Sequence, residues 1–413
     1  MRGVLRVQRP TGVTERIEVL DIIRGYALFG VLLVNMVMIN SLLMEFGAGL
    51  DLLSQPARLA TAWERTTAWI VQIFFQGKFY TIFAFLFGLG FYLFLNRNEA
   101  QAGTNRRLFV RRVSILLAIG LLHMIFIWWG DVLFTYALIG FLLMLFRTAS
   151  FGQIRAWATG LLLISFALLP LSVFMAAPQW AEGGAALEAM APFLEQARAV
   201  YQEGTYWELV VHRWRYEFLG VLVNAIAMIP RILGLFLVGL YVGKLGIFQR
   251  VADHLPLIAR ARTIGLVGGG LLTLAHVGLQ LGILEGYLTP VASSAASMLL
   301  REVSTPLISL FYVTCIIGIW HSGALSGVFS GLATLGRMAL TNYLVQCVVL
   351  AWLFYGHGLG LMGMSIAYMP AIALAIYVAQ IALSRFWLER YNQGPAEWVW
   401  RRLTYGTSTS SSI

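Results

Sequence analysis

His123 and Asp131 are the residues of this sequence best suited to chemistry, because they stand close together in the apolar stretch LLHMIFIWWGDVLF, residues 121–134. An imidazole takes and gives protons near neutral pH, and a nearby carboxylate can orient it. We therefore predict that His123 is a general base supported by Asp131. Two other interpretations stay open: a neutral histidine bonded to a helix carbonyl, and an aspartate that caps the next helix.

A second polar group lies in the first apolar run and consists of Asp21, Arg24 and Asn35. Arg24 and Asn35 are 11 residues apart, and on a helix such a spacing returns to within about 20° of the same direction. Asp21 stands one turn before Arg24. We predict a polar column on one face of this helix. The alternative is that Arg24 reaches inner lipid headgroups beside Asp21 while Asn35 bonds to a neighbouring helix.

Two basic residues are predicted to bind substrate. Lys78 is one of only two lysines in the chain and precedes an apolar run, so it either binds an anionic group or extends to the outer surface. Arg231 follows Pro230 in the middle of another apolar run. A proline frees a backbone carbonyl there. An arginine at that depth needs a protein interior, a carboxylate or an anionic ligand.

Four further residues complete the predicted substrate-binding set. Trp128 and Trp129 are typical of the outer membrane interface, which puts them near Asp131. Asn342 and Gln346 are four residues apart in GRMALTNYLVQCVV and therefore share a helix face. Hydrogen bonding between helices is the ordinary explanation of such a polar pair.

The composition defines the elements that carry these residues. The chain has 413 residues, 59% hydrophobic and 12% charged, with a mean hydropathy of +0.77, whereas soluble domains are about a quarter charged. A bilayer needs roughly 20 apolar residues per helix, and such runs predict about ten spans. We therefore predict an all-α polytopic membrane helix bundle. The predicted spans are residues 24–44, 78–95, 112–129, 131–147, 155–175, 218–243, 263–284, 304–321, 338–356 and 364–384.

Basic residues predict the orientation, because basic loops stay in the cytoplasm. On alternate ends of the spans, 21 of the 29 Lys and Arg fall in the segments 1–24, 96–112, 147–155, 244–262, 321–337 and 385–413. Both termini are therefore predicted to be cytoplasmic. We expect one membrane domain over residues 1–413, with cytoplasmic segments 1–20 and 385–413 and an outer loop of amphipathic helices at 176–217.

Several functional classes are excluded. The net charge of +10 follows from the topology and does not indicate nucleic-acid binding. No P-loop, Rossmann or EF-hand pattern occurs in the sequence, which argues against an ATP-driven pump. Cys315 and Cys347 have no metal-ligand spacing, so neither a metal site nor a disulfide is expected.

Five stretches together resemble a known family. They are RIEVLDIIRGYALFGVLLVNM, FFQGKFYTIFAFLFGLGF, RRVSILLAIGLLHMIFIWWGDVLFTYALIG, GRMALTNYLVQ and ERYNQGPAEWVWRRLTYG. In order and spread they resemble the YeiB-like family, known as domain of unknown function 418. The resemblance covers nearly the whole chain and implies a multi-pass protein of the bacterial inner (plasma) membrane.

The first span is also distantly similar to the opening of membrane-bound acyltransferases. Leu20-Asp21 and Arg24-Gly25 are followed by a polar residue 11 positions after the arginine. That residue is a histidine in acyltransferase family 3 and an asparagine, as at Asn35, in relatives of heparan-α-glucosaminide N-acetyltransferase. This chain has no histidine at 35, and residues 45–77 contain no match for the catalytic histidine of the second group.

Those enzymes pass an acetyl group from cytoplasmic acyl-CoA to a sugar hydroxyl or amine on the far side. The similarity implies that Arg24 and Asp21 lie near the CoA thioester and that Asn35 positions the acyl carbonyl. We therefore interpret the chain as a transmembrane acyltransferase in which His123 is the base. Asn35 and Asn342 would stabilise the oxyanion.

The expected donor is acyl-CoA without a metal, and the expected acceptor is a small molecule, lipid or glycan at the outer face. Membrane lipids are expected partners, nucleic acid is not, and homo-oligomerisation stays open. The alternative is a transporter, or a protein that binds lipid or small molecules without acyl transfer. Arg231 would then bind an anionic group beside Pro230.

Overall fold

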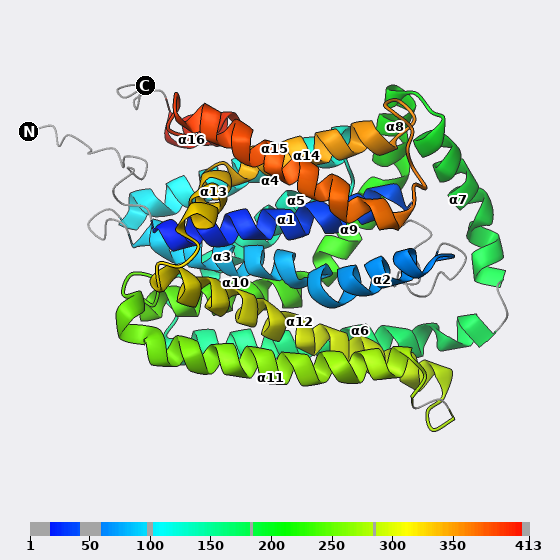
Figure 1. Ribbon diagram of the computed structural model, residues 1–413, viewed down its shortest axis with the longest axis horizontal. Coiled ribbons are helices and arrows are strands. Elements are labelled where there is room, and N and C mark those ends of the chain that lie inside the picture. Colours follow the sequence, from blue (N-terminus) through cyan, green and yellow to red (C-terminus); the bar gives the residue numbers. More distant parts are fainter. Residues whose placement is uncertain (1–16, 42–58, 97–101, 182–184, 284–285, 407–413) are drawn as a thin grey trace, which may run out of the picture.

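A computed structural model describes residues 17–41, 59–96, 102–181, 185–283 and 286–406, and its regular structure is helical (Figure 1). The N-terminal half contains α1 (Glu18–Asn40), α2 (Ala62–Ile70), η4 (Val71–Phe75), α3 (Lys78–Leu95), α4 (Ala102–Phe126), α5 (Val132–Gly140), η6 (Phe141–Phe146), α6 (Phe151–Ala181) and α7 (Ala185–Gln202). The rest contains α8 (Tyr206–His212), η7 (Arg213–Glu217), α9 (Phe218–Ala227), α10 (Ile229–Leu245), η8 (Val251–His254), α11 (Leu255–Gln280), α12 (Pro290–His321), α13 (Ser326–Arg337), α14 (Ala339–Phe354), η9 (Ile366–Tyr368), α15 (Met369–Leu388) and α16 (Pro395–Tyr405).

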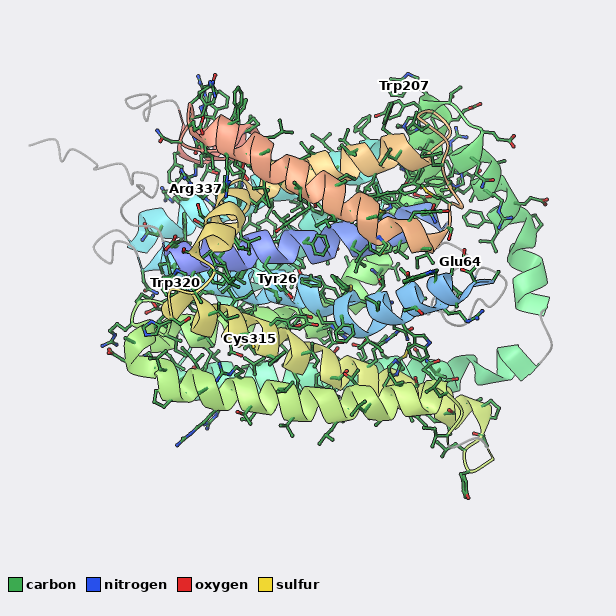
Figure 2. All side chains as sticks on the ribbon, in the orientation of Figure 1. Tyr26, Glu64, Trp207, Cys315, Trp320 and Arg337 are labelled. Carbon is green, nitrogen blue, oxygen red and sulfur yellow. The ribbon has the colours of Figure 1, made fainter. Side chains whose placement is uncertain are left out.

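The protein is a polytopic, all-α membrane protein, as the sequence predicts. Among the described residues, seven helices are long and apolar enough to cross a membrane, or up to nine if two bent helix pairs each count as one span. The apolar helix Val132–Phe146 is shorter. Each of the ten predicted spans falls on one of these helices. The number is higher than seven because it also includes the two bent helix pairs and the short helix. Figure 2 shows Trp320 and Arg337 at the end of the bundle where α1 begins, and Glu64 and Trp207 at the other end.

Helix α1 lies inside the bundle and is the most deeply buried of the long apolar helices in the described part of the chain. It packs on α13, α14, α3 and α15. A Cβ atom at Gly25 would lie 2.0 Å from the carbonyl oxygen of Leu332, so α13 approaches the backbone of α1 directly. The Tyr377 hydroxyl donates a 2.7 Å hydrogen bond to the Gly25 carbonyl from α15. The residues Asp21, Arg24 and Asn35 are thus on the central helix.

Two broken helices lie side by side. The stretch Ala62–Leu95 is interrupted by the π-helix η4 and by Gly77, whose φ of 83° is left-handed. The second helix bends by 52° between α9 and α10, where Pro230 occupies the first turn of α10. Cβ atoms at Gly88 and Gly239 would lie 1.8 Å from the Phe236 carbonyl and 2.0 Å from the Phe85 carbonyl. The direction of the two helices follows from contacts further apart: Arg231 lies over the ring of Tyr80 near the start of both helices, and Gly243 packs against Tyr92 near their ends. α3 and α10 therefore run parallel with their N-termini adjacent.

The C-terminal helix α16 fixes a sharp bend between α13 and α14. This bend is 82°. The Glu397 carboxylate accepts hydrogen bonds from the backbone N–H of Leu340 at 2.7 Å and of Thr341 at 3.1 Å, and from the Thr341 hydroxyl at 2.6 Å. These are the free N–H groups of the first turn of α14. A residue more than 50 positions away in the chain therefore caps this helix.

The predicted outer loop 176–217 is mostly helical. Helix α6 continues to Ala181, and α7, α8 and η7 follow, with α7 forming the right edge of the view in Figure 1. The Tyr201 hydroxyl donates to Glu217 at 2.8 Å, and the Gly356 N–H donates to the Tyr201 carbonyl at 2.9 Å. These bonds attach the segment to the loop after α14. The predicted cytoplasmic segments lie partly outside the described residues, at 1–16 and 407–413.

The two glycines of FGLGF test the packing of α3 on α10. We expect Gly88→Leu to lower the unfolding temperature in detergent strongly, because overpacking costs about 1–3 kcal/mol or more and the obstructing atom is a backbone carbonyl. Gly90→Leu is the matched control, since no atom lies within 4 Å of a Cβ there. Equal melting temperatures for the two variants would contradict this packing.

Candidate functional site

The structure brings His123 and Asp131 together. The turn between α4 and α5 folds back, so that His123 Nδ1 lies 3.0 Å from Asp131 Oδ1 with both side chains buried. The other Asp131 oxygen accepts the Phe134 N–H at 2.5 Å and caps α5. Tyr343 of α14 donates to Asp131 at 3.3 Å, and Cys347, one turn further, interacts with His123. His123 is therefore paired with a carboxylate and not with a helix carbonyl.

This buried group is closed to solvent. His123 is 2% exposed and Asp131 5%, and Cys347 is fully buried. The ring nitrogens of His123 have no well-aligned hydrogen bond among the described residues, so the 3.0 Å contact with Asp131 is chiefly electrostatic. A proton acceptor is thus present, but a substrate must open the helix packing to reach it.

The polar column on α1 does not reach His123. Arg24 is bonded to Asp21 at 2.6 Å, at the end of the bundle where α1 begins. Between Arg24 and Asn35 the same stripe carries Leu28, which is fully buried, and Val31, which is 9% exposed. Asn35 is half-buried, and its side chain forms no hydrogen bond with another described residue. In the described part of the chain, no hydrogen bond or ion pair joins Arg24 or Asn35 to His123.

The polar pair on α14 joins two helices. Asn342 donates to the Ser384 hydroxyl at 3.1 Å, and Gln346 donates to the side chain of Gln380 at 2.8 Å, so both point at α15. Tyr343 and Cys347 point at His123 from another face of α14. The ordinary explanation, hydrogen bonding between helices, therefore accounts for this pair, and Asn342 does not face His123.

The two tryptophans differ in environment. Trp128 is 1% exposed and belongs to the hydrophobic core, so its ring is covered by protein. It is covered because the backbone N–H groups of Ile127 and Trp128 both bond to the His123 carbonyl, at 2.8 and 3.0 Å, which turns the chain inward. Trp129 is half-buried, with its ring 5.9 Å from that of Trp128.

Three charged residues lie buried inside the helix bundle, where ionisable side chains are rare. We call them the charged cluster: Lys78, Arg231 and Glu302. Arg231 forms an ion pair with Glu302, and the two residues are 5% and 8% exposed. Lys78 is 2% exposed and lies midway along the 34-residue stretch Ala62–Leu95. Its side chain therefore does not extend to the surface, and helical structure already begins 16 residues earlier, at Ala62.

Lys78 has no carboxylate partner among the described residues. Its ammonium group donates to the Gln72 carbonyl at 3.0 Å, whereas an ammonium group has three donors. It also lies within electrostatic range of Arg231 and Arg301. Arg301 makes a further interaction of its own. The charged cluster therefore has two cations and one carboxylate, even without Arg301.

Unsatisfied polar atoms accompany these charges. Arg231 Nε and Gln72 Oε1 are buried without a hydrogen-bond partner in the described structure. Each buried polar group without a hydrogen-bond partner lowers the stability of the folded protein by about 1–3 kcal/mol. The amide nitrogen of Gln72 lies 3.3 Å from His276, whose other ring nitrogen lies 2.9 Å from the Ser297 hydroxyl. The cluster is thus embedded in a polar layer that joins α3, α11 and α12.

The N-termini of α3 and α10 add positive electrostatic potential at the charged cluster. Lys78 is the first residue of α3 and Arg231 is the third of α10, and the N-terminus of a helix carries about half a positive charge. Because α3 and α10 are parallel with adjacent N-termini, the helix dipoles and the two cations act in one place. π-Helices such as η4, just before Lys78, are frequent at functional sites.

Sequence patterns did not indicate that Glu302 and Gln72 belong to this site. Glu302 follows Arg301 in LLREVSTP, so it looks like one charge of a hydrated loop. Helix α12 begins 12 residues earlier, at Pro290, and carries Glu302 inside. The one available signal was Arg231 itself, since an arginine at that depth requires an anion.

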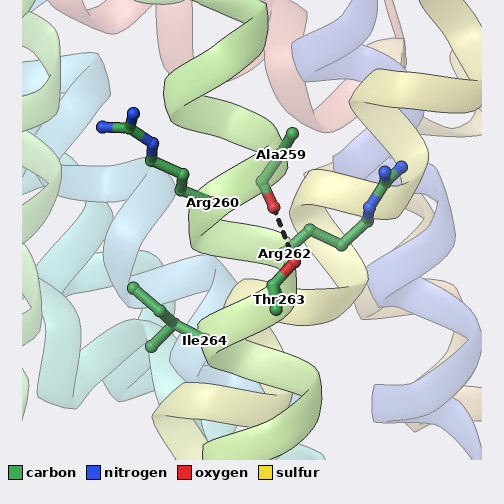
Figure 3. Close-up of a pocket in the computed structure, with 5 residues that line it drawn as sticks. All are labelled: Ala259, Arg260, Arg262, Thr263 and Ile264. Atoms are coloured by element: carbon green, nitrogen blue, oxygen red, sulfur yellow. Dashed lines mark hydrogen bonds between the residues drawn. The ribbon is translucent and has the colours of Figure 1, made fainter.

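Other candidate sites are poorer. A hollow on α11 is lined by five residues of a single stretch, Ala259, Arg260, Arg262, Thr263 and Ile264, and the Thr263 hydroxyl bonds back to the Ala259 carbonyl (Figure 3). Arg260 and Arg262 point apart there, so no polar groups converge. In the described ranges, no group of three or more His, Cys, Asp or Glu could hold a metal ion.

Comparison with known proteins gives the family. A family model described as "Protein of unknown function (DUF418)" matches residues 242–407. The uncharacterized protein YxaH of Bacillus subtilis is 32% identical over 96% of each chain. The chain belongs to the DUF418 family. The uncharacterized YeiB of Escherichia coli is 28% identical over 94% of this chain and 96% of its own. An uncharacterized 39.9 kDa protein of Bacillus acidopullulyticus, from the amylase 3' region, is 28% identical over 96% of each chain.

The DUF418 match and the longer alignments cover different parts of the two sites. Residues 242–407 include Glu302 of α12 and Tyr343 of α14, but they leave out Lys78, His123 and Arg231. The relatives align along nearly the whole chain, over 96% of it for YxaH and 94% for YeiB. No solved structure matches this fold.

The cap and ion pair at Asp131 predict a stability effect. We expect Asp131→Ala to destabilise the protein by about 2–4 kcal/mol, because it removes the cap of α5 and the partner of a buried histidine. Asp131→Asn keeps a capping oxygen and should therefore destabilise the protein less than Asp131→Ala does. Thermal unfolding in detergent measures both, with Asp253→Ala, at an exposed position, as the control. An Asp131→Ala variant as stable as this control would refute the pairing.

Proposed function

We propose that this DUF418 protein binds a small carboxylate-, sulfate- or phosphate-bearing anion at the charged cluster, in the middle of the membrane, and carries it across. The observation that supports this most is that a buried lysine without a carboxylate partner lies beside an arginine, at the N-termini of two broken helices. A membrane protein that only needed a stable bundle would gain nothing from an unpaired buried cation.

The chemistry of the cluster favours oxoanions. A guanidinium group presents donors in a planar fork that matches a carboxylate or phosphate, and Arg231 is already paired with such a group, on Glu302. Broken helices whose N-termini point at an anionic substrate near the bilayer midplane are typical of secondary transporters. The same oxoanion chemistry is found on free solutes and on lipid headgroups, so the test must separate them.

Replacing Lys78 tests the proposal directly. We expect Lys78→Met in liposomes to lower uptake of radiolabelled acetate and sulfate at least tenfold, because the site loses its uncompensated charge. Its thermal stability should be unchanged or higher, since the variant leaves no carboxylate unpaired. Lys244→Met is the matched control, because Lys244 donates to the Ala149 carbonyl at the far end of α10.

Transfer of fluorescent phosphatidic acid between leaflets, measured with the same variants, tests a lipid headgroup as the anion. A Lys78→Met variant that transports acetate, sulfate and phosphatidic acid like the wild type would remove the anion proposal. A variant that loses stability along with uptake would point to a structural role for Lys78.

Acyl transfer is a second candidate, and one observation favours it: His123 and Asp131, chosen from the sequence as base and supporting acid, lie 3.0 Å apart. His123 would take the proton of an acceptor hydroxyl or amine as that group attacks the carbonyl carbon of an acyl-CoA thioester. The carbon–sulfur bond would then break, and CoA would leave as the free thiol with the proton that His123 had taken. Arg24 would hold the donor at the opposite end of α1. The burial of His123 and the apolar residues between Arg24 and Asn35 make this candidate the weaker one.

His123→Gln provides the test of acyl transfer. Loss of a general base lowers the rate about 10²–10⁴-fold. Consumption of radiolabelled acetyl-CoA by the protein in native lipid nanodiscs should therefore fall about 100-fold or more. His321→Gln is the control because His321 is exposed. Equal acetyl-CoA consumption by both variants would exclude this role of His123.

A further inference from the structure

Glu302 occupies the place that an anion would take. Arg231 has no other carboxylate partner in the described part of the chain, so an incoming anion has to compete with Glu302 for the guanidinium group. If Glu302 kept its charge, two anions would share a site that is less than a tenth exposed. Like charges at close range in a buried site are strongly unfavourable, and one of them is protonated instead.

We propose, on the basis of the anion site above, that Glu302 takes up one proton when an anion binds to Arg231 and Lys78, so that the anion and the proton cross the membrane together. The proton comes from water on the side of entry and returns to water on the side of release. No net charge then enters the buried cluster with a monovalent anion. As a carboxylic acid, Glu302 can also donate a hydrogen bond to the bound anion.

The surroundings of Glu302 leave this role to Glu302 alone among the described acidic residues. The charged or titratable groups around Arg231 and Glu302 are Lys78 and Tyr80 of α3, Tyr136 of α5, His276 of α11 and Arg301 of α12 itself. His276 is hydrogen-bonded on both ring nitrogens. The only charged residue of α6 is Arg155, near the start of that helix. Cations thus surround one carboxylate.

The affinity for acetate as a function of pH tests the coupling, because acetate stays ionised above about pH 6. With one proton taken up per anion, the wild-type affinity should rise roughly tenfold for each pH unit lowered in the range where Glu302 titrates. Glu302→Gln should bind acetate with an affinity that no longer changes with pH. Glu389→Gln is the control, because its side chain is 73% exposed, and it should keep the wild-type slope.

A measurement on the unaltered protein covers the case in which Glu302→Gln does not fold. Calorimetric heats of acetate binding in two buffers of different ionisation enthalpy give the number of protons taken up, and we expect about one per anion. Suppose that the wild-type protein binds acetate without taking up a proton and with an affinity that does not change with pH. This result would overturn the coupling but leave the anion site intact. Absence of acetate and sulfate binding at every pH would overturn both.

Discussion

Burying two cations beside one carboxylate is the constraint on which the rest of this structure depends. Lys78 and Arg231 can be kept out of lipid only if several helices surround them, and α3, α10, α11 and α12 do so. Removal of a charge from water costs several kcal/mol even after relaxation. The close approach of α3 and α10 through Gly88 and Gly239 holds the two helices together over the turns that follow their N-termini. The stability of the bundle is thus tied to a polar interior.

The second buried group, around His123, has a different character. It is built from one carboxylate, one imidazole, one phenol and one thiol, with Asp131 bonded on both oxygens. Its charge is balanced within the group, and its carboxylate has a structural task as the cap of α5. The charged cluster has neither property. The contrast is the reason for placing ligand binding at Lys78 and Arg231 and treating His123 as a second candidate.

The sequence predicted more of the fold than of the site. Apolar runs found all the spans because the cost of an unpaired backbone in lipid leaves little choice but helix. They did not indicate that Lys78 is buried, because the stretch of residues 62–75 before it is also helical and packs within the bundle. His123 and Asp131 came together as predicted because a short turn joins their helices. Glu302 was missed, since its contact with Arg231 joins segments 71 residues apart in sequence and no local pattern marks it.

The cap that Glu397 provides for α14 implies an order of assembly. Its acceptor oxygens satisfy the first turn of α14 from a helix that the ribosome makes more than 50 residues later. Until α16 has left the ribosome, the elbow between α13 and α14 has bare N–H groups and can adopt other angles. α14 also carries the face toward Asp131 and the face toward α15. Final alignment of the helices on both sides of α14 therefore waits until α16 has been made, and a chain cut short before residue 395 would reach the membrane with every span present but α14 uncapped.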